Sequence, residues 1–167
     1  MSAQYRAVIV GHTGQGDYGH GLDIVYDDVP EVEVVAVADP DAEGLATARE
    51  RIGAANAYAD YREMLEREEF DLVNVCPRVV TPHAAMVIAA AEAGARGIFC
   101  EKPLAASLVE ADAMMAACAA RNVKVAVAHR RANPYEQYGK KLVDEGAIGE
   151  LQVLRARGKW DRRHGAE

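Results

Sequence analysis

Short apolar runs recur along the chain and alternate with longer stretches that carry helix start and stop signals. The runs are rich in Val, Ile and Ala and are nearly continuous, as in strands that are buried on both faces of a parallel sheet. They predict five strands, at residues 5–10, 34–38, 71–76, 97–100 and 123–128. Because strands and helices alternate, we expect an α/β fold with a doubly wound parallel sheet and right-handed crossovers.

The stretches between these runs begin and end like helices. Thr81 offers a cap before Pro82 at the first helical position, and Gly94 follows the last turn. Capping-box patterns begin at Asp60 and at Ser107. Together with the positions of the strands, these signals predict helices at about residues 17–28, 41–53, from 60, 82–94, from 107, and 134–145.

The pattern changes after residue 128. The last expected helix leads to residues 150–159, whose mixed apolar and Arg content predicts a partly exposed strand, and a polar stretch follows at 161–167. We therefore expect residues 1–128 to form one domain, and residues 129–167 to be the connecting helix and first strand of a truncated second domain of the α+β class. The unpaired N–H and C=O groups at a strand edge can bond to another chain, so we expect a homo-oligomer that forms through this C-terminal sheet.

Composition and charge exclude several classes of protein. The 167 residues are 50% hydrophobic and 27% charged, as in an ordinary folded domain. The net charge of −7 disfavours binding to nucleic acid or to anionic membranes. The apolar runs at 84–91 and 113–120 are too short to span a membrane, and the chain begins without the features of a signal peptide. We therefore expect a cytoplasmic protein with no membrane partner.

The cysteines indicate the redox compartment. Cys76, Cys100 and Cys118 are odd in number and include no CxxC pair. They predict buried, reduced thiols rather than a disulfide framework or a zinc cluster. We expect no metal site.

Five of the 14 glycines lie between Gly11 and Gly21, directly after the first predicted strand. Residues 14–19 match the pattern GxGxxG. Between a buried strand and an expected helix, this pattern predicts a dinucleotide site with the pyrophosphate at the helix N-terminus. A flexible surface turn is the alternative interpretation. A nucleotide triphosphatase loop is not supported, because His20 stands where that loop requires Lys.

Asp39 ends the second predicted strand, 25 residues after Gly14. An acid at about this spacing binds the adenosine ribose in dinucleotide-binding folds. A carboxylate repels a 2′-phosphate, and Pro40 and Asp41 supply no compensating Arg. NAD is therefore favoured over NADP. Asp39 could equally cap the helix that follows Pro40.

The sequence Glu101-Lys102-Pro103 stands directly after the strand predicted at 97–100. With the glycine-rich loop and Asp39, this motif resembles the Gfo/Idh/MocA oxidoreductases, the group of glucose-fructose oxidoreductase and inositol dehydrogenase. The resemblance extends over nearly the whole chain and includes Cys76-Pro77 followed by His83, residues 128–131 after the last strand, and residues 146–150 at the start of the second domain. It implies that residues 1–128 are an NAD(P)-binding Rossmann domain.

The resemblance also implies an activity. It indicates an NAD-dependent oxidoreductase that acts on a CH–OH group of a sugar, a polyol or a related secondary alcohol. Lys102 would lie near the nicotinamide and substrate as the catalytic residue and assist proton transfer, with Glu101 beside it and Pro103 shaping the turn. A lysine in a partly dry cleft suits this task, because the hydroxyl must lose its proton as the hydride leaves. The alternatives are a solvated surface salt bridge at Glu101 and, for the whole chain, a non-catalytic NAD-binding or sensing module.

The residues expected to bind the cofactor come from the loop and from the ends of several strands. His83 could instead be a packing or capping residue, and His129 could touch the nicotinamide or the substrate. The loop is longer than is common in the family, so either Gly14 or Gly16 could meet the phosphates. The resemblance implies that the catalytic His and Asp come from a C-terminal domain, which we expect to be missing from this chain. The full set is Gly11, Thr13, Gly14, Gln15, Gly16, Gly19, Asp39, Cys76, Pro77, His83, Glu101, Lys102 and His129.

Overall fold

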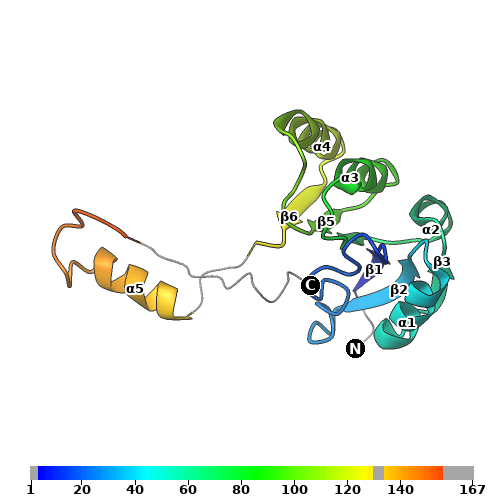
Figure 1. Ribbon diagram of the computed structural model, residues 1–167, viewed down its shortest axis with the longest axis horizontal. Helices are drawn as coiled ribbons and strands as arrows, with labels where there is room; N and C mark the ends of the chain where they lie inside the picture. Colours follow the sequence, from blue (N-terminus) through cyan, green and yellow to red (C-terminus); the bar gives the residue numbers. More distant parts are fainter. Residues whose placement is uncertain (1–3, 130–133, 156–167) are drawn as a thin grey trace. The chain divides into compact units, whose positions relative to one another are not determined.

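The computed structural model describes residues 4–129 and 134–155. Within them, one sheet of six parallel strands has the order β3-β2-β1-β4-β5-β6 (Figure 1). The doubly wound parallel sheet predicted from the sequence is confirmed, since this strand order places the reversal between β1 and β4. The strands are β1 (Tyr5–Val10), β2 (Val32–Ala38), β3 (Asn56–Tyr58), β4 (Leu72–Val75), β5 (Gly97–Cys100) and β6 (Lys124–Val127).

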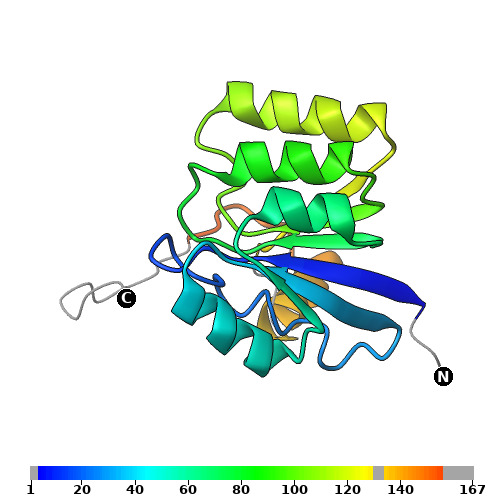
Figure 2. The ribbon, with the colours of Figure 1, turned by 90° about the vertical axis from the view of Figure 1, so that its right-hand side faces the viewer.

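Helices cover both faces of the sheet. Figure 2 shows α2, α3 and α4 on one face and α1 on the other. Val8 and Val10 of β1 belong to the apolar core that includes Met64 of α2, whereas Ile9 belongs to a second core with Ala48 of α1. This alternation follows from the two-residue period of a strand. The helices are α1 (Ala42–Ile52), α2 (Tyr61–Arg67), α3 (His83–Glu92), α4 (Leu108–Ala120) and α5 (Pro134–Asp144).

Most helix ends lie where the capping signals predict them. The cap predicted at Thr81 is wrong, because α3 begins at His83 with Pro82 at its N-cap position and no side-chain bond there. The Asp41 carboxylate accepts the Gly44 N–H at 2.7 Å at the start of α1, and Gly53 ends this helix with a φ of 73°. The Ser107 hydroxyl accepts the Glu110 N–H at 3.2 Å at the start of α4. The Glu110 side chain in turn accepts the Ala106 N–H at 2.9 Å. These bonds satisfy N–H groups that a helix start otherwise leaves unpaired.

The helix predicted at 17–28 is wrong, because this segment is a series of turns. Asp17, Gly19 and Gly21 have positive φ angles of 53°, 64° and 79°, which a right-handed helix does not allow. The segment is instead held to the sheet by Asn74 of β4. The Asn74 amide donates to the Leu22 carbonyl at 2.6 Å and accepts the Tyr26 hydroxyl at 2.7 Å.

Two further strand predictions need correction. The short edge strand β3 has no counterpart in the sequence prediction, because its three residues are too few to show a period. Residues 150–155 form no strand, so the strand predicted at 150–159 is wrong for that part. Residues 156–159 lie outside the described residues, as do residues 130–131 of the family resemblance.

The chain divides into two compact units, Met1–His129 and Arg130–Glu167. In the second unit, α5 carries an exposed ion pair between Lys140 and Asp144 at 2.6 Å, one helical turn apart. The assignment of this unit to a substrate domain stays a prediction. Of the helices in the described ranges, none combines the length and the apolar character needed to cross a membrane.

Candidate functional site

The predicted site residues gather at the carboxyl edge of the sheet. Gly11 follows β1, Asp39 follows β2, Cys76 follows β4 and Glu101 follows β5. In open α/β sheets, ligands bind outside the carboxyl ends of the strands, at the point where the strand order reverses. Here that point lies between β1 and β4, directly beside the glycine-rich loop.

The glycine-rich loop packs closely on the chain that follows β4. The Arg78 N–H donates to the Gly16 carbonyl at 3.3 Å, and the Val79 N–H donates to the Gln15 carbonyl at 3.1 Å. A Cβ at Gly16 would lie 2.6 Å from the Arg78 nitrogen, so only glycine allows this approach. Gly14 differs, because its φ is +80° but a Cβ there would meet open space. The loop is therefore docked in place rather than a free surface turn.

This loop can offer backbone N–H groups to an anion, but no helix N-terminus supports them. The predicted position of a pyrophosphate on a helix dipole is wrong in this respect, because turns follow the loop. Within the loop, the Gly14 N–H already donates to the Asp17 carboxylate at 2.9 Å. A phosphate would therefore meet an Asp side chain that competes for the same N–H group.

Asp39 is buried, with 1% of its surface exposed, and it holds the loop to β2. Its carboxylate accepts the Thr13 N–H at 3.0 Å, the Thr13 hydroxyl at 2.9 Å and the Asp41 N–H at 3.0 Å. The alternative role as the cap of α1 is wrong, since Asp41 is that cap. A ribose hydroxyl that binds Asp39 has to compete with the two groups of Thr13.

A cavity of about 380 Å³ opens beside Asp39, between the ends of β1 and β2 and the first turns of α2 and α3. Its volume lies in the range of small-molecule and cofactor sites. The guanidinium of Arg62 lies 4.5 Å from the centre of the Tyr61 ring, and both residues line the cavity. The other lining residues are Gly11, His12, Ala38, Asp39, Pro40, Ala59, Asp60, Pro82, Ala85 and Met86.

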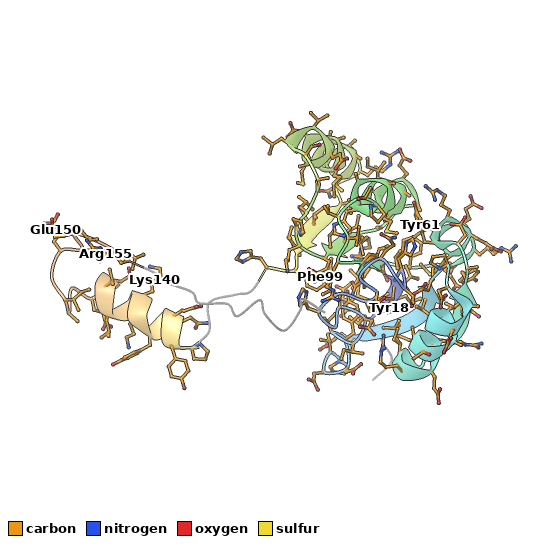
Figure 3. All side chains as sticks on the ribbon, in the orientation of Figure 1. Tyr18, Tyr61, Phe99, Lys140, Glu150 and Arg155 are labelled. Carbon is orange, nitrogen blue, oxygen red and sulfur yellow. The ribbon has the colours of Figure 1, made fainter. Side chains whose placement is uncertain are left out.

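Tyr18 packs beneath the loop. Tyr18 belongs to the core on the α1 side of the sheet (labelled in Figure 3). A Cβ at Gly11 would lie 2.3 Å from its ring, which explains the glycine at the end of β1. Burial raises the pKa of Tyr18, and the nearby Asp39 carboxylate adds to this shift. The phenol is therefore neutral at physiological pH.

Glu101 is the most deeply buried acid of the site, with no exposed surface. One carboxylate oxygen contacts Nδ1 of His20, and the other accepts the backbone N–H of Lys102. The Lys102 side chain is exposed. The alternative interpretation of Glu101, a solvated surface salt bridge, does not describe its contact with His20. His20 reaches solvent, but Glu101 does not.

His83 joins two of the strand ends. It is fully buried, with Nε2 2.6 Å from the Pro77 carbonyl oxygen and Nδ1 3.0 Å from the Pro103 carbonyl oxygen. This geometry matches the packing role that the sequence left open. Whether His83 and Pro77 also contact a cofactor stays a prediction, as it does for His129, which is exposed after β6.

The three thiols are buried and unpaired, as predicted from the sequence. Burial raises the pKa of Cys76 well above its ordinary value. Burial and the Glu101 carboxylate raise the pKa of Cys100 to about 12. These thiols are therefore neutral packing groups. Across residues 4–129 and 134–155, no three His, Cys, Asp or Glu side chains are grouped in a way that could hold a metal ion.

Sequence reasoning missed two residues of this edge, His20 and Arg62. In the sequence, His20 is noted only because it stands where a nucleotide triphosphatase loop requires Lys. Its place among the loop glycines is the signal that could have marked it as a residue of this edge. Arg62 follows the cap of α2, and nothing in its local pattern indicates that it lines the cavity beside Asp39.

Comparisons with known proteins identify relatives of this chain. The D-apiose dehydrogenase of Paraburkholderia graminis is 36% identical over 123 residues, which cover 73% of this chain and 32% of that protein. The levoglucosan dehydrogenase of Pseudarthrobacter phenanthrenivorans is 37% identical over 131 residues, which cover 76% of this chain and 32% of that protein. This chain thus spans about a third of the length of these curated relatives.

A solved structure of a dehydrogenase has the same fold as this chain. The crystal structure of myo-inositol 2-dehydrogenase from Lactobacillus plantarum matches with a TM-score of 0.75 and 30% identity, over 88% of this chain and 43% of that one. Residues 5–129 also match the model of an oxidoreductase family with an NAD-binding Rossmann fold. The resemblance noted in the sequence is confirmed: the chain belongs to the Gfo/Idh/MocA oxidoreductase family and carries its NAD-binding Rossmann fold.

Proposed function

We propose that this chain is the cofactor-binding half of an NAD-dependent dehydrogenase that oxidises a secondary alcohol of a sugar or polyol. The position of Lys102 carries the proposal, because its exposed side chain follows a buried, hydrogen-bonded Glu101 at the same sheet edge as the glycine-rich loop. The names of the relatives support the substrate class, since D-apiose and levoglucosan are sugar derivatives and myo-inositol is a polyol.

The residues present fit the cofactor. The cavity beside Asp39 has room for the adenosine, and the space where a side chain would stand at Gly14 is open, so a pyrophosphate could approach the backbone there. NAD, when bound, supplies a nicotinamide that accepts the hydride. Lys102 takes up the hydroxyl proton of the substrate. Asp39 binds the adenosine ribose and disfavours a 2′-phosphate, so the preferred cofactor is NAD rather than NADP.

The test of cofactor binding is a calorimetric titration of the purified chain with NAD, NADH and NADPH. We expect saturable binding of NAD and NADH and weaker binding of NADPH. The Asp39→Ala variant should bind NAD at least about tenfold more weakly, because it loses a hydrogen bond to the ribose and also releases the Thr13 N–H and hydroxyl that hold the loop to β2. Lack of NAD and NADH binding at millimolar concentration would overturn the proposal for this chain.

The catalytic half of the proposal is tested on a protein that contains this chain and has the length of its curated relatives. Reduction of NAD with a sugar or polyol, abolished in a Lys102→Met variant that still binds NAD, is the expected result. Unchanged turnover in that variant would remove Lys102 from the mechanism. The relatives named above are dehydrogenases, so none of them favours a non-catalytic NAD-binding or sensing module.

Location and assembly are part of the same proposal. We place the protein in the cytoplasm, because its three cysteines are buried free thiols. A homo-oligomer formed through the C-terminal sheet stays a prediction, and it has lost part of its basis because residues 150–155 form no strand.

A further inference from the structure

The loop after β1 and the segment after β5 meet at one buried carboxylate. Glu101 contacts Nδ1 of His20 through one oxygen and the N–H of Lys102 through the other. Gly19 precedes His20 with a φ of 64°, and a Cβ there would lie 2.9 Å from Cγ of Glu101 and 2.5 Å from the Cys76 carbonyl oxygen. Glycine at this position therefore lets the loop lie directly on Glu101 and on the end of β4.

A carboxylate without exposed surface is stable only when donors satisfy it. Among the described residues, His20 supplies the side-chain contact to Glu101, and the Lys102 backbone supplies the second. His20 and Glu101 are 81 residues apart in the chain, so their contact joins two segments that no local structure connects. The His20 side chain is 54% exposed, so it reaches Glu101 from the solvent side of the loop.

The same segments are tied a second time beneath the first contact. His83 lies between the carbonyl of Pro77, after β4, and the carbonyl of Pro103, after β5. The chain after β4 is in turn bonded to the loop through the Arg78 N–H and the Gly16 carbonyl at 3.3 Å. The loop and the two strand ends thus form a closed ring of contacts, in which Lys102 stands between two fixed neighbours.

We propose that His20 is a positioning residue. It holds Glu101 in place, and Glu101 fixes the backbone of Lys102, so that the loop expected to bind the phosphates and the lysine expected to move the proton are set as one unit. This inference rests on the proposed function, because it concerns the same NAD site. It predicts that cofactor binding and the environment of Lys102 change together.

The experiment uses the chain itself and compares His20→Ala with His20→Asn. The Asn amide can donate from nearly the position of His20 Nδ1, whereas Ala removes the contact. Two quantities are measured: the NAD dissociation constant by calorimetry, and the rate at which a trace amine-acylating reagent modifies Lys102, followed by peptide mass spectrometry with and without NAD. Asp28→Ala, at an exposed residue of the following turns, is the matched control.

In the wild type and the control, NAD should slow the modification of Lys102. In His20→Ala we expect NAD affinity to fall about tenfold, the effect of one hydrogen bond to a charged group. At saturating NAD, the protection of Lys102 should be reduced in the same variant. His20→Asn should restore both properties.

The outcomes separate the two proposals. Failure of the wild type to bind NAD would overturn the proposed function. If the wild type binds NAD and His20→Ala keeps the wild-type NAD affinity and the wild-type protection of Lys102, the role of His20 is overturned and the proposed function stands. If His20→Ala does not fold, His20→Asn is compared with His20→Gln, whose longer side chain puts its amide at the position of Nε2. Equal behaviour of these two variants would then overturn the inference.

Discussion

At the scale of single residues, the loop glycines have different tasks. Gly14 and Gly16 both have positive φ angles, of 80° and 86°, so both backbone positions favour glycine. Only Gly16 also lies against a neighbouring segment, with the backbone of Arg78 inside the volume that a Cβ would occupy. A side chain at position 14 would cause backbone strain alone, whereas a side chain at position 16 would cause strain and steric overlap.

We expect Gly14→Ala to lower the free energy of unfolding by about 1 kcal/mol, the cost of a left-handed backbone at a non-glycine residue. Gly16→Ala should cost about 3 kcal/mol, because the overlap with Arg78 adds to that strain. Urea denaturation followed by circular dichroism measures both values. Equal losses in the two variants would show that the contact with Arg78 does not matter for stability.

The sequence allowed the prediction of residues that belong to local motifs and missed those that act through distant contacts. Asp39 was predicted as a site residue from its place at a strand end, and Lys102 from the Glu-Lys-Pro motif that resembles the family. His20 could not be paired with Glu101, and Arg62 could not be placed beside Asp39, because the fold alone brings these segments together. The role of Asp39 as a fixed anchor for Thr13 was hidden for the same reason.

At the scale of elements, most helices with a capping signal were predicted well, whereas the cap predicted at Thr81 and the helix predicted at 17–28 were wrong. The helix start predicted at residue 41 and the capping boxes predicted at Asp60 and Ser107 are true helix starts, because each of these residues supplies an acceptor for an unpaired N–H. The segment at 17–28 was judged from its place after the loop, although its own residues favour turns. Its attachment depends on Asn74, a polar side chain in the middle of the sheet.

Asn74→Ala should lower the free energy of unfolding by about 2 kcal/mol, because the Leu22 carbonyl and the Tyr26 hydroxyl lose their partner in a buried setting. Tyr26→Phe removes one of these bonds and should cost about 1 kcal/mol. Hydrogen exchange of the amides in residues 17–28 provides the check. If Asn74→Ala leaves their exchange rates unchanged, Asn74 does not hold this segment.

At the scale of the whole molecule, the prediction of a doubly wound sheet succeeded because buried parallel strands leave a strong apolar signal. The same burial controls the response of the protein to alkali. Cys76 directly follows β4, and Cys100 is the last residue of the neighbouring strand β5. Both thiols are buried, and their pKa values lie above the ordinary thiol value of 9.0. An unfolded chain releases these protons more readily than the folded one.

A group whose pKa is higher in the folded state contributes stability that is present at low pH and is lost as the pH rises. The free energy of unfolding should therefore decline from about pH 9 towards pH 12, the range between the ordinary thiol value and the raised pKa of Cys100. Urea titrations across this range measure the decline. A Cys100→Ala variant should show a shallower slope, and an identical slope would assign the decline to other groups.

The bonds between Thr13 and Asp39 have a consequence for protein engineering. A common way to exchange coenzyme preference is to replace the acid after the second strand with a neutral or basic residue. Here that change would also release the Thr13 N–H and hydroxyl and detach the loop from β2. Residues 13 and 39 therefore have to be redesigned together, and any variant at residue 39 needs a new anchor for the loop.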